Sequence, residues 1–229
     1  MRNLLWKEWH EQSWKLAFSC IVLGALALIG LHARIVADQT MMMWVCFLGI
    51  TLLPVLSSTG LIPAERAEGS FESLLAMPIA PWRILVAKTA MGMLLCIGPL
   101  AVAALLSLLV AGGREVTPLS IFDLYGRSTL ESLSFFLWML ALTARLPSES
   151  RAGLVAVGVL ILWMLASMAL ASPNLPLFPL LFTVSPLAFL SGVGGMLNGG
   201  PKLVTVLLTQ VVILTPLWAS TVRSLKNPT

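Results

Sequence analysis

Apolar residues in this sequence form long blocks that short polar stretches separate. Several blocks are about 20 residues long, which is the helix length that crosses a hydrocarbon core about 30 Å thick. The sequence therefore predicts an all-α integral membrane protein, with six transmembrane helices in a single domain, residues 1–229. The expected spans are Leu16 to Leu31, Met41 to Ile62, Ile84 to Ala111, Ser128 to Leu146, Ala152 to Ala171 and Leu203 to Ala219.

Residues 1–15 precede the first apolar block and have a different pattern. Leu5, Trp6 and Trp9 fall near one side of a helical wheel, with charged residues mostly elsewhere. Tryptophan favours the membrane interface, so we expect a helix in the headgroup layer; a solvated tail is the alternative. Glu8 and Glu11 interrupt the basic start, and we expect the first span to be retained rather than cleaved as a signal peptide.

A proline-rich and glycine-rich segment, residues 173–201, separates the last two spans. Irregular backbone at membrane depth is tolerated only where it is buried in protein or lines a cavity. The segment Leu177 to Val193 is therefore predicted to be an external re-entrant or interfacial hairpin, and a seventh full span is the alternative.

The basic residues predict the orientation. If the amino terminus is cytoplasmic, ten of the 14 Lys and Arg residues lie inside and four lie outside. This distribution satisfies the positive-inside rule. Both termini are then cytoplasmic, as is the longest polar loop, residues 64–83.

Composition supports membrane insertion and argues against other classes. Hydrophobic residues make up 58% of the chain and charged residues 10%, against about 25% charged in a soluble domain. The net charge of +4 is scattered over many loops and forms no basic stripe for nucleic acid. Cys20, Cys46 and Cys96 are far apart, with no CxxC pair that would indicate a disulfide framework or a zinc site.

The cytoplasmic loop contains a pattern typical of a short amphipathic helix. Gly69 and Ser70 are a plausible helix start, and Pro78 ends the pattern. The spacing of Phe71, Leu74 and Leu75 gives the helix an apolar face. Glu68 and Glu72 mark an acidic face. Such a helix can dock in a groove on a soluble partner or rest on the bilayer, and the pattern leaves both open.

The same loop resembles the signature of the ABC type-two permease family, the membrane subunits of many bacterial exporters. The matching residues are Glu65-Arg66, Glu68, Gly69, Glu72, Leu74-Leu75, Pro78, Leu85 and Lys88. The run Leu5 to Trp9 is similar to that family's amino-terminal elbow helix, and the segment before the last span to its external re-entrant helices.

The resemblance implies that the loop carries a coupling helix that contacts a separate ATPase. The contact residues it implies are Glu65, Arg66, Glu68, Gly69, Phe71, Glu72 and Leu75. It also implies a second permease copy or paralogue, two ATPase subunits that bind ATP and magnesium, and location in a bacterial plasma membrane. The phosphate-binding motif GxxxxGK[ST] does not occur in this sequence, which agrees with ATP binding by another chain. We expect no catalytic site, metal or cofactor here.

Glu131 is the one carboxylate within a predicted span, four residues after Arg127. Two interpretations remain open: a local ion pair near the external end, or a role in the substrate path or gate. A non-transporting scaffold or sensor, and an ion-driven secondary transporter, are the alternatives to an exporter. No nucleophile and base, acidic pair or metal triad suggests an intramembrane protease.

Overall fold

The computed structural model describes residues 2–34, 36–71, 80–111, 116–170 and 203–226. These residues form six long helices and one short one. The helices are α1 (Arg2–Ala33), α2 (Asp38–Leu61), α3 (Pro63–Ala67), α5 (Pro81–Ala111), α6 (Pro118–Thr143), α7 (Glu149–Leu170) and α9 (Leu203–Lys226). The all-α prediction is confirmed for this part of the chain.

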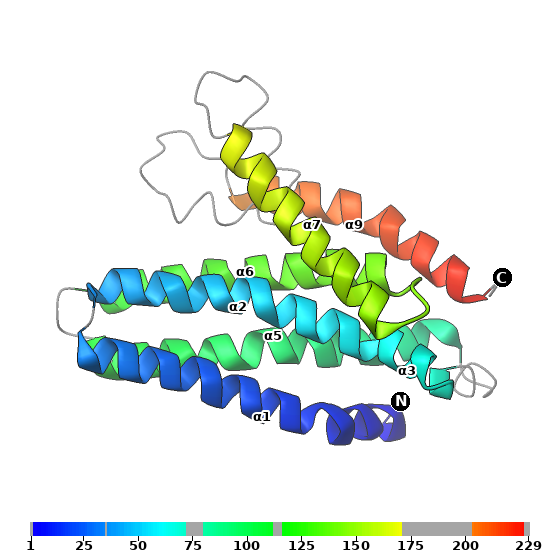
Figure 1. The fold of residues 1–229 in the computed structure, drawn as a ribbon, viewed down its shortest axis with the longest axis horizontal. Helices are drawn as coiled ribbons and strands as arrows, with labels where there is room; N and C mark the ends of the chain where they lie inside the picture. Colours follow the sequence, from blue (N-terminus) through cyan, green and yellow to red (C-terminus); the bar gives the residue numbers. More distant parts are fainter. Residues whose placement is uncertain (1, 35, 72–79, 112–115, 171–202, 227–229) are drawn as a thin grey trace.

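The long helices α1, α2, α5 and α6 lie lengthwise beside one another, and α7 and α9 cross them obliquely (Figure 1). The helix α1 packs chiefly on α5, and α2 packs chiefly on α6. Both chain termini, α3, and the start of α5 lie at the same end of the bundle (Figure 1). We call this the polar end, because the charged residues described below gather there.

Three of the described helices are long and apolar enough to cross a membrane. They are Leu4–Ala33, Asp38–Ala67 and Pro81–Ala111, with mean hydropathies of 2.2, 2.0 and 2.6 over their most apolar windows. At 1.5 Å per residue each extends beyond a hydrocarbon core about 30 Å thick. The fold is thus that of a helical protein with up to three clear candidate spans, and crossings by α6, α7 and α9 stay a prediction.

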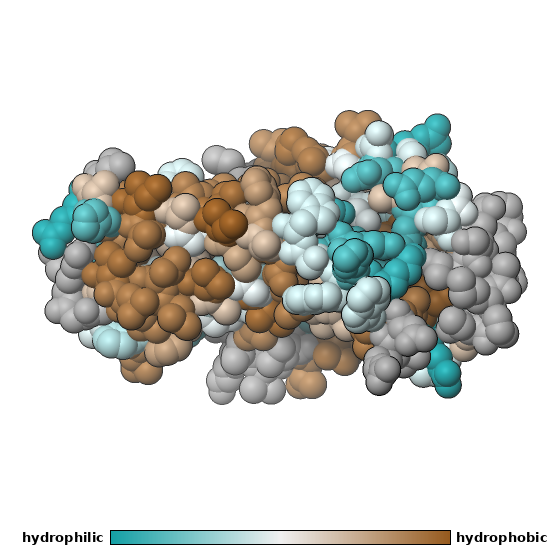
Figure 2. All heavy atoms as spheres, turned by 90° about the horizontal axis from the view of Figure 1, so that it is seen from below, coloured by the Kyte–Doolittle hydropathy of each residue, from teal (hydrophilic) through white to brown (hydrophobic). Residues whose placement is uncertain are grey.

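The distribution of polarity differs from that in a soluble protein, because many large apolar side chains are exposed and several charged ones are buried. Trp6, Ile21 and Leu109 are about two thirds or more exposed, whereas Glu8, Lys88 and Glu131 are almost fully buried. Apolar side chains cover much of the face in Figure 2, and most hydrophilic residues gather towards the end where α1 begins. An extended apolar surface of this kind marks contact with a membrane or another protein.

The first helix differs from the expectation of a separate interfacial helix at residues 1–15. The helix α1 continues without a break from Arg2 to Ala33. The sequence between those residues contains no proline, and its first glycine is Gly24, so nothing forces the chain to turn near residue 15. The predicted elbow is therefore the first half of α1.

The helix α6 begins ten residues before the predicted span. Thr117 caps its start by accepting a hydrogen bond from the Ser120 backbone N–H, and Pro118 occupies the first turn. Proline suits this position because its ring fixes a helical φ and the first-turn N–H groups have no partner within the helix. Asp123 and Arg127 then form an ion pair one turn apart, so a sequence that looked like a polar loop is helical.

Close helix packing depends on glycines. A Cβ atom added at Gly92 of α5 would lie 2.1 Å from Cζ of Phe136 on α6, and one at Gly49 would lie 2.5 Å from Cδ2 of Leu100. Hydrogen bonds join the same helices, including one of 2.8 Å between the hydroxyls of Ser107 and Tyr125. Small residues let helices in a bilayer approach closely, where polar groups can bond across the interface. The predicted re-entrant segment, residues 173–201, lies outside the described residues.

The glycine contact between α5 and α6 gives a test of this packing. Gly92→Leu should destabilise the protein by about 1–3 kcal/mol or more, because the ring of Phe136 occupies the space the new side chain needs. Thermal unfolding of the detergent-solubilised protein measures the loss. The matched control is Gly126→Leu on α6, where an added Cβ meets no atom within 4 Å. Equal unfolding temperatures for the two variants would contradict the packing described here.

Candidate functional site

The predicted coupling loop starts with a short helix that the sequence pattern did not indicate. The helix α2 ends at Leu61, and α3 (Pro63–Ala67) follows after Ile62 alone. Pro63 occupies the first turn of α3, and Glu65 places a negative charge near the positive end of its helix dipole. A proline followed closely by an acidic residue was the available signal for this start.

A sharp turn follows α3 and brings the loop back towards the bundle. Gly69 has a φ of 73°, in the left-handed region that glycine adopts without a steric penalty. The Glu68 and Gly69 backbone N–H groups donate to the carbonyls of Ala64 and Arg66, which closes the end of the short helix. Ser70 and Phe71 then have helical backbone, in agreement with the predicted start at Gly69 and Ser70. Residues 72–79, including Glu72 and Leu75, lie outside the described residues.

Phe71 faces the protein interior. Its side chain is 2% exposed and belongs to the main hydrophobic core. The Arg66 guanidinium lies 5.3 Å from the centre of the Phe71 ring, an arrangement typical of a cation–π contact. The resemblance assigns Phe71 to the ATPase contact, and that assignment stays a prediction; in this structure the buried ring anchors the turn to the bundle.

The surface of the turn is formed by other residues from the predicted set. Glu68 and Gly69 are exposed, together with Ala67, while Arg66 is half-buried. Ser70 Oγ donates to the Glu65 carbonyl over 3.3 Å and so holds the two sides of the turn together. Among the loop residues that the structure describes, the exposed part of the candidate site is therefore Ala67 to Gly69.

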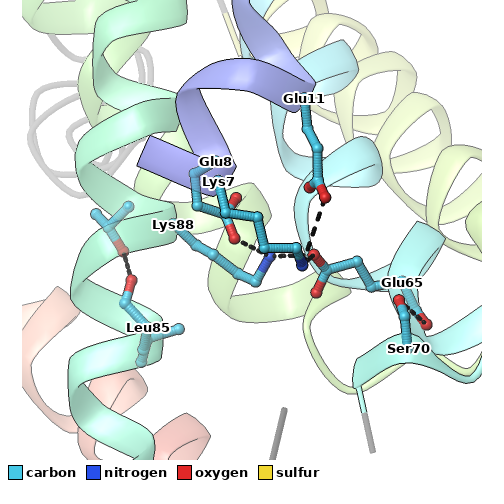
Figure 3. Close-up of polar contacts among 8 residues, drawn as sticks. Lys7, Glu8, Glu11, Glu65, Ser70, Leu85 and Lys88 are labelled. Carbon is cyan, nitrogen blue, oxygen red and sulfur yellow. Dashed lines mark hydrogen bonds and ion pairs between the residues drawn. The ribbon is translucent and has the colours of Figure 1, made fainter. Parts of the chain in front are cut away.

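A salt-bridge network lies directly beneath this turn (Figure 3). Lys88 of α5 points between α1 and α3, and its Nζ lies 2.8 Å from Oε1 of Glu8 and 2.8 Å from Oε1 of Glu65. Lys7 Nζ lies 3.4 Å from the same Glu65 oxygen and 3.5 Å from Oε1 of Glu11. One lysine therefore connects three helices.

The two halves of the network differ in burial. The side chains of Lys88 and Glu8 are 1% and 0% exposed, and that of Glu65 is 10% exposed, whereas Lys7 and Glu11 are about two fifths exposed. Burying charged groups is unfavourable unless opposite charges compensate them. Lys88 faces both buried carboxylates, and Lys7 faces that of Glu65 as well, so positive charge from two ammonium groups compensates the buried negative charges.

The network uses residues that sequence reasoning treated separately. Glu65 and Lys88 were part of the resemblance to the permease family, but their partner Glu8 was not identified. The periodicity gave a weak signal: Glu8 and Gln12 are four residues apart on one face of α1 and both are buried, while Trp6 and Trp9 are exposed. In water the polar face of an amphipathic helix is exposed and its apolar face is buried. In a bilayer the polar face turns inwards, so the polar positions of α1 indicate the face that packs on other helices.

Glu8, Glu11 and Glu65 also have the spacing of a metal site, since one carboxylate oxygen from each lies within 4.8 Å of the others. The neighbouring lysines decide the interpretation. Lys7 and Lys88 lie within 3.5 Å of these carboxylates and supply the positive charge that a cation would bring. We therefore describe the cluster as a salt-bridge network.

Glu131 lies far from this network in the sequence and in a different setting. It is fully buried on α6, and Arg127 forms its ion pair with Asp123, with 2.8 Å between Nε and Oδ1. The two interpretations of Glu131, a local ion pair with Arg127 and a role in the substrate path or gate, both stay predictions. Glu131 precedes Ser134 and Trp138 on one helical face, and both of these side chains donate to Oε1 of Gln210 on α9.

Comparisons with protein-family models and with curated proteins found no match for this chain. The resemblance to the permease family therefore remains a prediction that depends on the residues of the loop.

Lys88 gives a direct test of the network. Lys88→Met should lower the free energy of unfolding by about 3–5 kcal/mol, because it leaves two buried carboxylates without their shared ammonium. Denaturant unfolding in mixed micelles measures the change. Arg127→Gln, which breaks an exposed pair, is the control and should cost about 1 kcal/mol or less. A loss for Lys88→Met no larger than that of the control would show that the network contributes little to stability.

Proposed function

We propose that this chain is the membrane-spanning permease subunit of an ATP-driven exporter and that the turn at Ala67 to Gly69 receives the movement of a separate ATPase. The observation that carries the proposal is the buried network that links this exposed turn to two long helices. A force applied at α3 reaches Lys88 through Glu65, and Lys88 bonds Glu8 in turn. The turn therefore cannot shift freely while α1 and α5 stay in place.

Three features support an intracellular docking position for the turn. It lies at the end of the bundle that also holds both chain termini (Figure 1). Ten of 14 basic residues fall on this side under the predicted topology, as cytoplasmic loops require. Glu68 is exposed and lies outside the salt-bridge network among the described residues, so its carboxylate is available to a partner.

The proposed mechanism is movement of rigid elements. In the proposed assembly, two permease copies enclose the path, and two ATPase subunits bind ATP and magnesium and draw together on the cytoplasmic side. Phe71 anchors the loop in the core, and the Glu65–Lys88–Glu8 network passes the displacement to α5 and α1. Packed helices respond to such a displacement by switching between discrete arrangements.

The topology that this function requires can be tested by labelling. Single cysteines at Glu68 and Leu119 should react from opposite sides of the membrane, because α5 crosses between them. An impermeant thiol reagent applied to intact cells should modify Leu119→Cys and spare Glu68→Cys. Cys20 is replaced by alanine in both variants, whereas Cys46 and Cys96 are buried and can stay. Modification of Glu68→Cys in intact cells would contradict the proposed orientation.

The docking role of the turn is tested by reversing its exposed charge. Glu68→Arg should reduce the amount of ATPase that copurifies about tenfold, since a reversed charge at a complementary contact weakens binding without disturbing the buried network. Export should fall in parallel, while the abundance of the permease in the membrane stays unchanged.

The matched control is Asp123→Arg, the same reversal at an exposed position on the first turns of α6. It should retain the ATPase at the wild-type level. If Glu68→Arg and Asp123→Arg both behave like the wild type, the turn is not the docking surface.

A further inference from the structure

A groove of about 240 Å³ opens beside α1 towards the polar end of the bundle. Residues of α1, α2 and α5 form its walls, and Glu149, the first residue of α7, closes one side. It shares no residue with the salt-bridge network. Its volume is close to the lower end of the range for small-molecule sites.

The groove has an apolar part and a charged part. Phe18, Leu53 and Leu56 form the apolar wall, and Phe18 and Leu56 are about three fifths exposed. Lys15 and Glu149 supply one positive and one negative charge. A surface that combines an apolar wall with two opposite charges is suited to an amphiphile with a zwitterionic head.

The position of Lys15 fits the level of a membrane interface. Its Nζ lies 5.9 Å from the ring centre of Trp14, and 3.0 Å from where a Cβ would stand on Gly60, in the last turn of α2. Tryptophan and lysine concentrate at this level, where an apolar stem and a polar tip are both accommodated. Among the described residues, neither Lys15 nor Glu149 forms a salt bridge, and both charges are open to a ligand.

We propose that this groove binds a membrane glycerophospholipid whose headgroup carries a primary ammonium, of the phosphatidylethanolamine type. The phosphate faces the Lys15 ammonium, the headgroup ammonium faces the Glu149 carboxylate, and one acyl chain follows Phe18 and Leu56. An anionic lipid without the ammonium satisfies Lys15 but offers no positive charge to Glu149. The paired charges therefore select a zwitterionic headgroup over an anionic one.

The proposed lipid site depends on the part of the proposed function that puts the bundle in a membrane. It does not depend on contact between the loop and an ATPase. A lipid in this groove contacts α1, α2 and α7 at once. It would fill the gap between α1 and the start of α7, two elements that are far apart in the sequence. The site is thus separate from the proposed ATPase contact, and either can fail without the other.

The test is native mass spectrometry of the full-length protein in detergent. The protein is titrated with phosphatidylethanolamine and with phosphatidylglycerol that carry identical oleoyl chains. The wild type should bind phosphatidylethanolamine about tenfold more tightly than phosphatidylglycerol, because one additional charge-assisted hydrogen bond changes affinity by about this factor. Glu149→Gln should abolish this preference by weakening phosphatidylethanolamine binding, and Lys15→Gln should weaken both lipids about tenfold.

Two further variants keep the result interpretable. Leu56→Trp fills the apolar part and should weaken both lipids if the chain lies there, while Lys15→Arg keeps the charge and should retain binding. Arg127→Gln, at the other end of the bundle, is the control for general loss of lipid. Equal binding of the two lipids by the wild type, wild-type selectivity in Glu149→Gln, or wild-type affinity for both lipids in Lys15→Gln would overturn the proposal.

Discussion

The position of Lys88 between Glu8 and Glu65 is the constraint on which the polar end of the molecule depends. Each of the two ion pairs has an Nζ to oxygen distance of 2.8 Å, and the ammonium is almost fully buried. Removing such charges from water is favourable only when their partners are held in place, so the three helices must keep one relative arrangement. The register of α1 against α5 and the direction in which α3 leaves α2 both follow from this requirement.

The same constraint explains how a short surface turn can affect a large apolar bundle. Glu65 is on the five-residue helix α3, and Gly69 turns the chain back so that Phe71 enters the core. The turn is therefore attached at two points, by charge beneath α3 and by an aromatic ring after it. Exposed side chains between these points remain available for contact with another protein.

The long apolar blocks of the sequence were easier to interpret than its polar segments. The apolar blocks correctly predicted the long helices, because their length and composition reflect the thickness of the bilayer. The spacing placed Phe71 on the apolar face of a helix that could dock on a partner or rest on the bilayer, and it could not show that the ring enters the core of the same chain. The predicted span began at Ser128, where the apolar block begins, and so missed the first ten residues of α6, in which Asp123 and Arg127 form a pair.

The network itself could not be predicted from spacing alone. Glu8 and Lys88 are 80 residues apart, and no local pattern indicates which carboxylate on α1 turns inwards. Periodicity gives the face of a helix but not the neighbour that the face meets. The exposed surface from Ala67 to Gly69, by contrast, lies within the loop at residues 64–83. The resemblance of that loop to a permease signature had already indicated it as the candidate site.

A double-mutant cycle between Glu8 and Lys88 tests most directly whether this lysine joins α1 to α5. The free energy of unfolding in mixed micelles is measured for the wild type, Glu8→Gln, Lys88→Met and the double variant. Direct contact within a buried network predicts a coupling energy of about 1–3 kcal/mol, with the double variant more stable than the sum of the single losses implies. Additivity within about 0.5 kcal/mol would contradict the account, because the two residues would then contribute independently.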